Sequence, residues 1–404
     1  MGFIDSDTHV LESDETWEFF DPSEREYQPI TLEYPDAADG PGVAGRRQYF
    51  VIGDTVGRKF AAEGMKNGDY GKDYPSEATF LLDPSVRLRE MDLLGIDVQV
   101  LFSTDYLTIG VDNPFAEAAL ARSYNRWIAS KTVDSGGRLR WAIVPPTLNM
   151  ERCLEELEFG KANGAIGVLL KGEEHGRSLS DPYFHPMYHK AEELDLTMCV
   201  HVGFVRNRFE GLPIGGTVPS GGNLMQQGFL SILNSGAPAF GSLVKRGAAG
   251  QGLSDLFPNL RFAFLEGGSS WLLGVFEGMK RSRSAVNNAN WVMTDKGASF
   301  VVPPLDVSAE MEAKNLFVAA FSTEDLPYLT RLVGPDHLII GSDYGHNDPG
   351  TDPLAHTMVM SRSDLDPTSA RKICDDNGRA AYNIPADFTP TGPIQVGEVP
   401  STVS

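Results

Sequence analysis

Cysteine is scarce in this chain: the 404 residues include only Cys153, Cys199 and Cys374, which lie far apart and form no CxxC pair. Secreted disulfide scaffolds and structural zinc modules need closely and regularly spaced cysteines. The sequence therefore argues against both classes, and a cytoplasmic location is expected because its reducing conditions suit isolated thiols.

Long apolar runs and an excess of positive charge are missing as well. There is no run of about eighteen apolar residues and no basic segment followed by an apolar core near the N-terminus, so neither a membrane span nor a signal peptide is expected. The formal net charge is -21 at pH 7. Nucleic acids and anionic membranes bind basic surfaces, so the expected partner is a small-molecule substrate.

What the sequence does contain is a regular alternation of apolar, strand-like runs with helix-like segments. This alternation is typical of repeated βα units and a parallel sheet. We predict strands at 3–9, 97–103, 139–145, 165–171, 196–202, 260–266, 316–321 and 338–343. Eight such units predict an α/β fold of the distorted (β/α)8 TIM-barrel type, with residues 1–384 as a single domain.

Several predicted helices have recognisable ends. Asp83 and Pro84 begin a helix that stops at Gly95, and 181–182 precede a helix near 187–194. A third helix follows the polar segment 322–325 and ends at Gly334. Short polar residues favour helix N-termini and glycine favours C-termini, so these segments are expected between the strands.

Two long insertions and a tail interrupt the alternation. The first insertion, at about 18–82 after the first strand, contains a predicted β-hairpin over 48–60. The second is a long glycine-rich loop at about 203–255 after the fifth strand. Both follow strand C-termini, so both are expected to border a binding site. Residues 385–404 are proline-rich and are predicted to form an extended arm.

Three of the predicted strands end in side chains that bind metals. Asp7 and His9 are two apart on the first strand and so share a face. His201 ends the fifth strand, and Asp343 follows the apolar run 338–340 of the eighth. Each residue alone has a plainer interpretation as a helix cap or a hydrogen-bonded core residue. Together they indicate one metal site, because the strand C-termini of a parallel barrel meet at one mouth.

The resemblance to a known family extends well beyond these residues. The chain resembles the amidohydrolase superfamily, in particular the amidohydrolase-2 branch that contains aminocarboxymuconate-semialdehyde decarboxylase and hydroxybenzoate decarboxylases. The segments that carry the resemblance are RLREMDLLGID at 87–97, DPYFHP at 181–186, CVHVG at 199–203, FPNLRF at 257–262, EGGSSW at 266–271, GSDYGH at 341–346 and DNGRA at 376–380.

The resemblance implies a catalytic divalent metal held by Asp7, His9, His201 and Asp343. Zinc is the ion most expected from the family, and manganese or iron would suit the carboxylate-rich set. This chain departs from the family at three positions. Other members of the family often have His or Glu at the position of Asp7 and a catalytic His at the position of Glu266. Gly345 occupies the position of the proline in the GSDYPH pattern.

Further residues are candidates for catalysis or substrate binding. Glu266 could be a ligand, an acid/base group or the ion-pair partner of Lys171, and His346 could orient Asp343 or contact the substrate. Candidate substrate-binding residues are Lys171, Arg206 and Trp271. Their plainer interpretations are a barrel ion pair, a surface charge and ordinary packing.

Three functions remain open at this point. The leading hypothesis is hydrolysis of an amide, ester or thioester by a metal-activated water, with Asp343 as the base. The alternative is non-oxidative decarboxylation of an aromatic or enol carboxylic acid, with Asp343 or Glu266 as the proton donor. A catalytically inactive binding barrel is the third. Because the family commonly forms dimers, a homodimer or higher homo-oligomer is expected.

Overall fold

The structure is a computed structural model that describes most of the chain. The described residues are 2–34, 47–52, 55–59, 74–108, 110–203, 252–278, 291–295, 297–300, 306–313, 315–346 and 350–390. Most of the second predicted insertion, including Arg206, lies outside these ranges, as do parts of the first insertion and residues 391–404.

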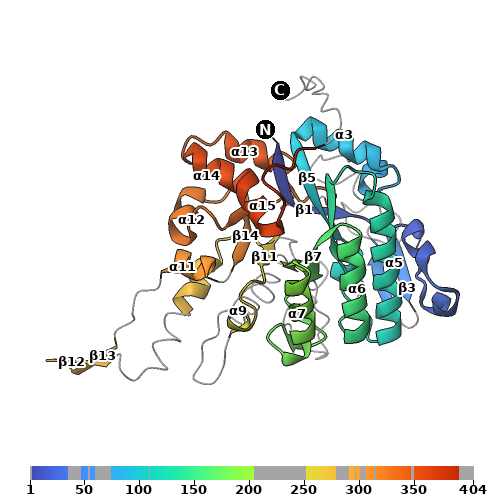
Figure 1. Cartoon of the computed structure of the whole chain (residues 1–404), viewed down its shortest axis with the longest axis horizontal. Coiled ribbons are helices and arrows are strands. Elements are labelled where there is room, and N and C mark those ends of the chain that lie inside the picture. The colour runs from blue at the N-terminus through green and yellow to red at the C-terminus, as the bar shows by residue number, and fades with distance from the viewer. Residues whose placement is uncertain are drawn as a thin grey trace.

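Eight parallel strands form one sheet that curls into a nearly closed barrel (Figure 1). In order around the sheet they are β1 (Phe3–Val10), β5 (Ile96–Ser103), β6 (Leu139–Ile143), β7 (Ala165–Leu170), β10 (Thr197–His201), β11 (Phe262–Leu265), β14 (Leu316–Ala320) and β15 (Leu338–Ile340). All eight predicted strands are confirmed, and the barrel prediction with them. Neighbours in the sheet are also neighbours in the order of strands along the chain, as repeated βα units require.

Helices surround this sheet on its outside. The longer ones are α3 (Pro84–Leu94), α5 (Pro114–Thr132), α6 (Met150–Ala162), α7 (His185–Glu193) and α12 (Leu326–Val333). The shorter helical segments are η1 (Asp14–Phe19), η2 (Pro22–Tyr27), α2 (Ser76–Thr79), α4 (Asp105–Thr108), η3 (Pro182–Phe184), α9 (Leu253–Leu256), α11 (Val307–Glu312), α13 (Ala355–Met360), α14 (Pro367–Arg371), η5 (Lys372–Asp376) and α15 (Asn377–Tyr382). Among the described residues, no helix combines the length and the apolar character needed to cross a bilayer.

The helices begin and end at the capping residues that the sequence predicts. Asp83 caps α3 by accepting a hydrogen bond from the backbone N–H of Ser85 at 2.9 Å, and Gly95 ends the helix with a φ of 72°. Only glycine adopts that left-handed backbone without steric cost. Asp325 caps α12 in the same way through the N–H of Tyr328, and Gly334 follows its last residue.

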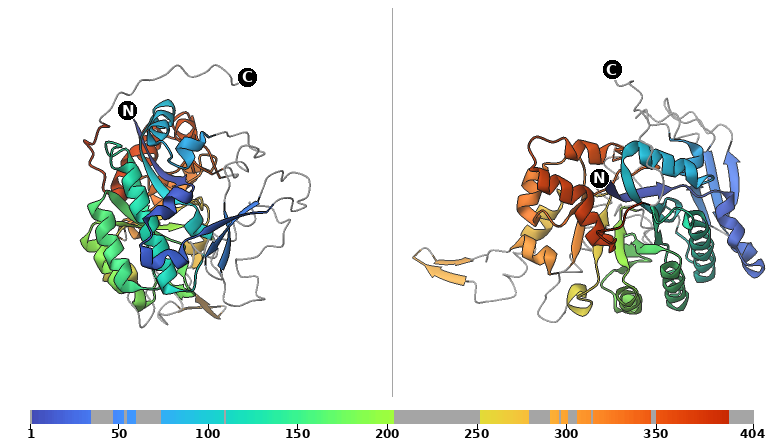
Figure 2. Two further views of the ribbon diagram at one scale, coloured as in Figure 1. Left: turned by 90° about the vertical axis from the view of Figure 1, so that its right-hand side faces the viewer. Right: turned by 45° about the horizontal axis from the view of Figure 1, so that its top comes forward.

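The remaining strands lie outside the barrel sheet. β2 (Ile30–Tyr34), β3 (Arg47–Ile52) and β4 (Thr55–Lys59) pair antiparallel within the first insertion. β8 (Glu173–Glu174) pairs with β9 (Arg177–Ser178), and β12 (Trp291–Thr294) pairs with β13 (Gly297–Phe300). The β12–β13 hairpin stands apart from the barrel in Figure 1 and in the right-hand view of Figure 2.

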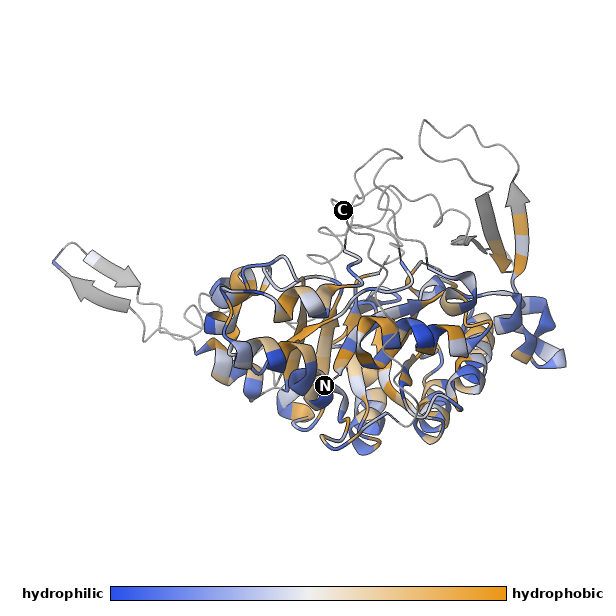
Figure 3. Cartoon of the chain, turned by 90° about the horizontal axis from the view of Figure 1, so that it is seen from above, coloured by the Kyte–Doolittle hydropathy of each residue, from blue (hydrophilic) through white to orange (hydrophobic). Residues whose placement is uncertain are grey.

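The apolar core lies between the strands and the helices that cover them. Val98, Val168 and Ile339 have no exposed surface and belong to a single large cluster of buried side chains. Figure 3 shows the strands as the more uniformly apolar layer, whereas the helices mix apolar and polar residues. Strands buried on both faces are expected to be apolar almost throughout, so the polar residues that do occur on them are informative.

A buried carboxylate links the first and last strands where the barrel closes. Asp5 on β1 has no exposed surface and accepts hydrogen bonds from the backbone N–H of Ser342 at 2.8 Å and its hydroxyl at 2.6 Å. Gln99 on β5 donates a third hydrogen bond to the same carboxylate at 3.3 Å. Burial raises the pKa of Asp5, and the hydrogen bonds from Ser342 oppose that shift. The carboxylate thus joins three segments of the barrel wall.

Backbone contacts complete the closure next to this carboxylate. The N–H of Asp343 donates to the carbonyl of Asp7 at 2.9 Å, and the N–H of His9 donates to the carbonyl of Tyr344 at 2.7 Å. Gly341 makes this approach feasible, because a Cβ atom there would lie 2.3 Å from Cβ of Asp7. The chain around Asp343 is therefore fixed against β1 over consecutive residues.

We predict that Gly341→Ala destabilises the protein by about 1–3 kcal/mol, because the added methyl group forces β15 away from β1. Urea unfolding followed by circular dichroism measures this change. Gly274→Ala is the matched control, since Gly274 is exposed and a Cβ there meets nothing within 4 Å. Equal stability of the two variants would contradict the close contact.

Candidate metal centre

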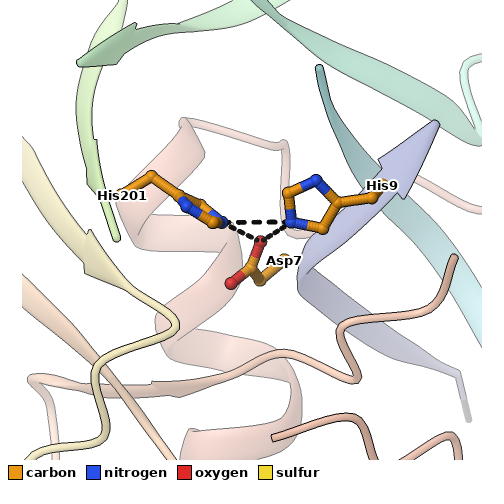
Figure 4. Close-up of side chains that lie close together, drawn as sticks. All are labelled: Asp7, His9 and His201. Atoms are coloured by element: carbon orange, nitrogen blue, oxygen red, sulfur yellow. Dashed lines mark hydrogen bonds and ion pairs between the residues drawn. The ribbon is translucent and has the colours of Figure 1, made fainter. Parts of the chain in front are cut away.

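Four side chains from three strands meet at the C-terminal mouth of the barrel. Asp7 and His9 point inward from β1, His201 is the last residue of β10, and Asp343 follows the end of β15. All four are at most 3% exposed. Figure 4 shows Asp7, His9 and His201 converging from opposite sides of the barrel. The residues grouped by the sequence analysis are thus neighbours in space.

The donor atoms of these side chains lie close to one another. Nε2 of His9 is 3.1 Å from Nε2 of His201 and 3.4 Å from Oδ1 of Asp343. Oδ1 of Asp7 is 3.2 Å from Nε2 of His201 and 3.5 Å from Nε2 of His9. Ligand atoms that surround a tetrahedral ion at about 2.1 Å are about 3.4 Å from one another. The spacing of Asp7, His9 and His201 therefore fits one divalent cation, and Asp343 borders this set through its contact with His9.

The histidine tautomer also fits a metal site. Nδ1–H of His201 donates to the carbonyl of Val202 at 2.7 Å, which leaves the Nε2 lone pair free to face Asp7. Metal-binding histidines are usually oriented in this way by a hydrogen bond from the other ring nitrogen. Two imidazole nitrogens and two carboxylate oxygens form a donor set that zinc, manganese and iron accept.

His9 and Asp7 have the protonation states that binding of a cation requires. Burial, with the neighbouring His346 and His201, holds the pKa of His9 well below its ordinary value, so this imidazole is neutral. Burial alone would raise the pKa of Asp7, but the imidazoles of His201 and His9 outweigh it and the pKa is lowered. Asp7 is therefore ionised. A histidine must be neutral and a carboxylate ionised before either can bind a metal ion.

A second set of acid/base groups borders the four candidate ligands. Nδ1 of His346 is 2.8 Å from Oδ1 of Asp343, and its ring stacks on that of His9 at 3.8 Å. Glu266 lies 3.4 Å from Nδ1 of His201 and 3.9 Å from Nδ1 of His346. His346 thus lies between two carboxylates and could carry a proton between them and a substrate.

The backbone is strained at both of these carboxylates. Asp343 has a φ of 52° and Glu266 a φ of 56°, values that residues with a side chain seldom adopt. Strained residues of this type cluster at functional sites, where the surrounding structure holds them. Gly345 has a φ of 108°, which proline cannot reach, so the proline of the GSDYPH pattern would not fit this turn.

Sequence reasoning missed three polar residues around the site. Thr351 donates its hydroxyl to Oδ2 of Asp343 at 2.7 Å. The Thr104 hydroxyl is 3.0 Å from Nε2 of His346 and donates to it when Nδ1–H faces Asp343. Neither threonine belongs to a recognisable motif. The third, Glu12, follows His9 by three residues, and its position just after a strand, which Thr104 shares, was a usable signal.

The predicted substrate-binding residues lie in different surroundings. Nζ of Lys171 is 3.8 Å from Glu174 and lies above the ring of Tyr106, so Glu174 rather than Glu266 is its carboxylate neighbour. The indole of Trp271 donates to the carbonyl of Gly268 at 2.8 Å. Arg206 is outside the described residues. Substrate contact by Lys171, Arg206 and Trp271 remains a prediction.

Comparison with known proteins identifies the family of this chain. A family model described as Amidohydrolase matches residues 78–384, about three quarters of the chain. The chain belongs to the amidohydrolase family. The resemblance that its motifs indicated is thereby confirmed, and members of this family are metal-dependent enzymes.

Solved structures with the same amidohydrolase fold include decarboxylases. An amidohydrolase of Mycobacterium avium subsp. paratuberculosis is 18% identical, with a TM-score of 0.68 over 95% of this chain and 98% of that one. A 5-carboxyvanillate decarboxylase of Novosphingobium aromaticivorans, with bound manganese and a nitrobenzoic acid, is 16% identical (TM-score 0.55; 78% of this chain, 87% of that one). A 2,6-dihydroxybenzoate decarboxylase in complex with 2,6-dihydroxybenzoate is 17% identical (TM-score 0.54; 78% and 92%).

Glu12 is an unusual carboxyl group beside this site. It is 2% exposed and accepts hydrogen bonds from the Ser103 hydroxyl and from the backbone N–H of Asp105. Burial raises its pKa to about 7 despite these bonds. The titratable groups that face it include Asp105, His346 and Tyr124. Because its pKa is higher in the folded state, Glu12 contributes stability below pH 4.5 that is lost as the pH rises through 7.

We predict that Glu12→Gln gains stability relative to the native protein as the pH rises from 4.5 to 8.5, by up to about 3 kcal/mol. Urea unfolding at several pH values measures the difference. Glu18→Gln, at an exposed position, is the control and should show no such trend. A difference that is constant with pH would show that Glu12 titrates normally.

Proposed function

We propose that this amidohydrolase is a metal-dependent decarboxylase that releases CO2 from a hydroxylated aromatic or enol carboxylic acid. The observation that carries the metal dependence is the convergence of Asp7, His9 and His201, whose donor atoms are 3.1–3.5 Å apart, with Asp343 3.4 Å from His9. Their burial at a barrel mouth supports a catalytic site rather than an incidental cluster.

Two considerations favour decarboxylation over hydrolysis, which the sequence alone ranked first. The structural relatives include two decarboxylases of aromatic acids, one of them with manganese. The site also supplies proton donors, since Glu266 and Asp343 flank His346 at 3.9 and 2.8 Å. Decarboxylation needs a proton at the carbon that loses CO2, and a buried acid/base cluster is suited to deliver it.

Asp7, His9, His201 and Asp343 would hold the cation, which when bound draws the substrate carboxylate and adjacent oxygen into the site and stabilises their negative charge. Side chains of the protein carry out the remaining steps. Glu266, or Asp343 through His346, delivers a proton to the ring carbon that bears the carboxylate. The bond from that carbon to the carboxylate then breaks, its electron pair returns to the ring, and CO2 leaves. The carboxylates and the Thr104 hydroxyl fix the orientation of His346.

Hydrolysis is the second candidate. Asp343 lies against the candidate ligands and is held by the Thr351 hydroxyl at 2.7 Å, a position suited to remove a proton from water and return it to a leaving group. The same four ligands would serve this reaction. An inactive binding barrel is the weakest candidate, because the whole cluster is present and two of its carboxylates have strained backbones.

The direct test uses hydroxybenzoates with a 13C-labelled carboxylate, incubated with protein supplied with manganese or zinc. We predict labelled CO2, and we predict that Asp343→Asn and Glu266→Gln each lower kcat by about 100-fold or more. Asp336→Asn, which replaces an exposed surface carboxylate, should leave kcat unchanged. Cleavage of amides or esters with incorporation of 18O from water, and no labelled CO2, would contradict decarboxylation and assign the protein as a hydrolase.

A further inference from the structure

Arg87, in the first turn of α3, is a charged side chain with no exposed surface. Among the described residues no carboxylate lies within ion-pair distance of its guanidinium, and its hydrogen bonds go to uncharged oxygen atoms. Burying a charge in this way costs free energy. The position of Arg87 therefore needs an explanation other than added stability, and its contacts supply one.

The guanidinium of Arg87 contacts both of the segments that meet where the barrel closes. On β1, Nη1 donates to the carbonyl oxygen of His9 at 3.1 Å. On the segment after β15, Cζ lies 3.9 Å from the centre of the Tyr344 ring, a cation–π contact. Tyr344 is fully buried and directly follows Asp343. One rigid, planar group thus contacts the backbone of one candidate ligand and the neighbour of another.

Further contacts fix both the guanidinium and the tyrosine ring. Nε of Arg87 donates to Oε1 of Gln99 on β5 at 2.6 Å, and the ring of Tyr74 lies 4.1 Å from that of Tyr344. Asp343 itself has a φ of 52°, a strained conformation that its surroundings must hold. Arg87 is therefore a fixed point against which the segment that carries Asp343 is held.

We propose that Arg87 is a positioning residue of the metal centre, which sets the affinity for the cation by keeping His9 and Asp343 in place, 3.4 Å apart. Contacts outside the ligands themselves orient those ligands, and losing one typically weakens metal binding by about 10- to 100-fold. The inference rests on the metal dependence in the proposed function. It does not depend on which reaction the metal serves.

The charge of Arg87 and its geometry act on a bound cation in opposite directions. A positive charge near the centre repels a divalent ion, so an effect of charge alone would make binding tighter when a neutral residue replaces Arg87. Loss of positioning makes binding weaker, because His9 and Asp343 must then be ordered when the ion binds. The direction of the change therefore separates the two effects.

The test is a titration of metal-free, full-length protein with Co2+, whose absorption bands report both affinity and coordination geometry. We expect Arg87→Met to raise the dissociation constant by about tenfold or more and to change the spectrum of the bound ion. Arg87→Lys keeps the charge but lacks the planar fork needed for both contacts, so an intermediate increase is expected. This variant keeps the test decisive if Arg87→Met does not fold.

Arg138→Met is the matched control, at the opposite end of the barrel. Arg138 is 6% exposed and donates to the carbonyl oxygens of Ile96 and Asp97, where β5 begins, and to the carboxylate of Asp92. Its replacement should lower the midpoint of urea unfolding, as replacement of Arg87 does, but should leave the Co2+ affinity and spectrum unchanged. A loss of stability is thereby separated from a loss of positioning.

A double variant tests whether Arg87 acts through Tyr344. Tyr344→Leu removes the ring that the guanidinium contacts, so it should also weaken Co2+ binding. If the two residues act together, the double variant Arg87→Met/Tyr344→Leu should weaken binding by less than the product of the two separate effects. Effects that multiply fully would contradict this route.

The outcomes separate this inference from the proposed reaction. Native Co2+ affinity and spectrum in both Arg87 variants, tighter binding by Arg87→Met, or an equal loss in Arg138→Met would overturn the role of Arg87 and leave the decarboxylation assay unaffected. A protein that shows the expected losses but releases no CO2 would keep the role of Arg87 and overturn the reaction. A native protein that binds no Co2+ would overturn the metal centre and this inference together.

Discussion

The contact on which the rest of the structure depends is the closure of the barrel between β1 and β15. A carboxylate with no exposed surface, Asp5, makes that contact by accepting both hydrogen bonds that Ser342 offers. Arg87 strengthens the same region, since its guanidinium donates to Gln99 at 2.6 Å and to the carbonyl of His9 at 3.1 Å. A buried polar group without such partners would be costly, so these hydrogen bonds specify how the barrel closes.

This closure also builds the metal centre. Residues 342–344 are bound to β1 through consecutive backbone and side-chain hydrogen bonds, which fix Asp343 in a left-handed conformation beside His9. Strand β10 brings His201 from the opposite wall. The barrel itself thus holds the donor atoms of Asp7, His201 and Asp343 within 3.5 Å of Nε2 of His9. A site arranged in advance in this way has little reorganisation left to do when a cation or substrate binds.

Much of this could be predicted from the sequence, and the limits have physical reasons. The eight strands and the caps at Asp83 and Gly95 depend on local patterns, and the candidate ligands lie where strands end, so neighbouring residues were enough to find them. Thr351 and Thr104 were missed because their role depends on contacts with Asp343 and His346 that no short motif encodes. The partner of Lys171 was also beyond prediction, because a two-residue strand, β8, carries Glu174 back toward it.

The central claim is that Asp7, His9, His201 and Asp343 together hold one divalent metal ion. Elemental analysis of the purified protein by inductively coupled plasma mass spectrometry tests it most directly, beside an Asp343→Asn/His201→Ala double variant and an exposed control, His189→Ala. We predict about one equivalent of zinc, manganese or iron in the native protein and in the control, and its loss in the double variant. A native protein with no stoichiometric metal after growth in supplemented medium, or a double variant that retains it, would contradict the account.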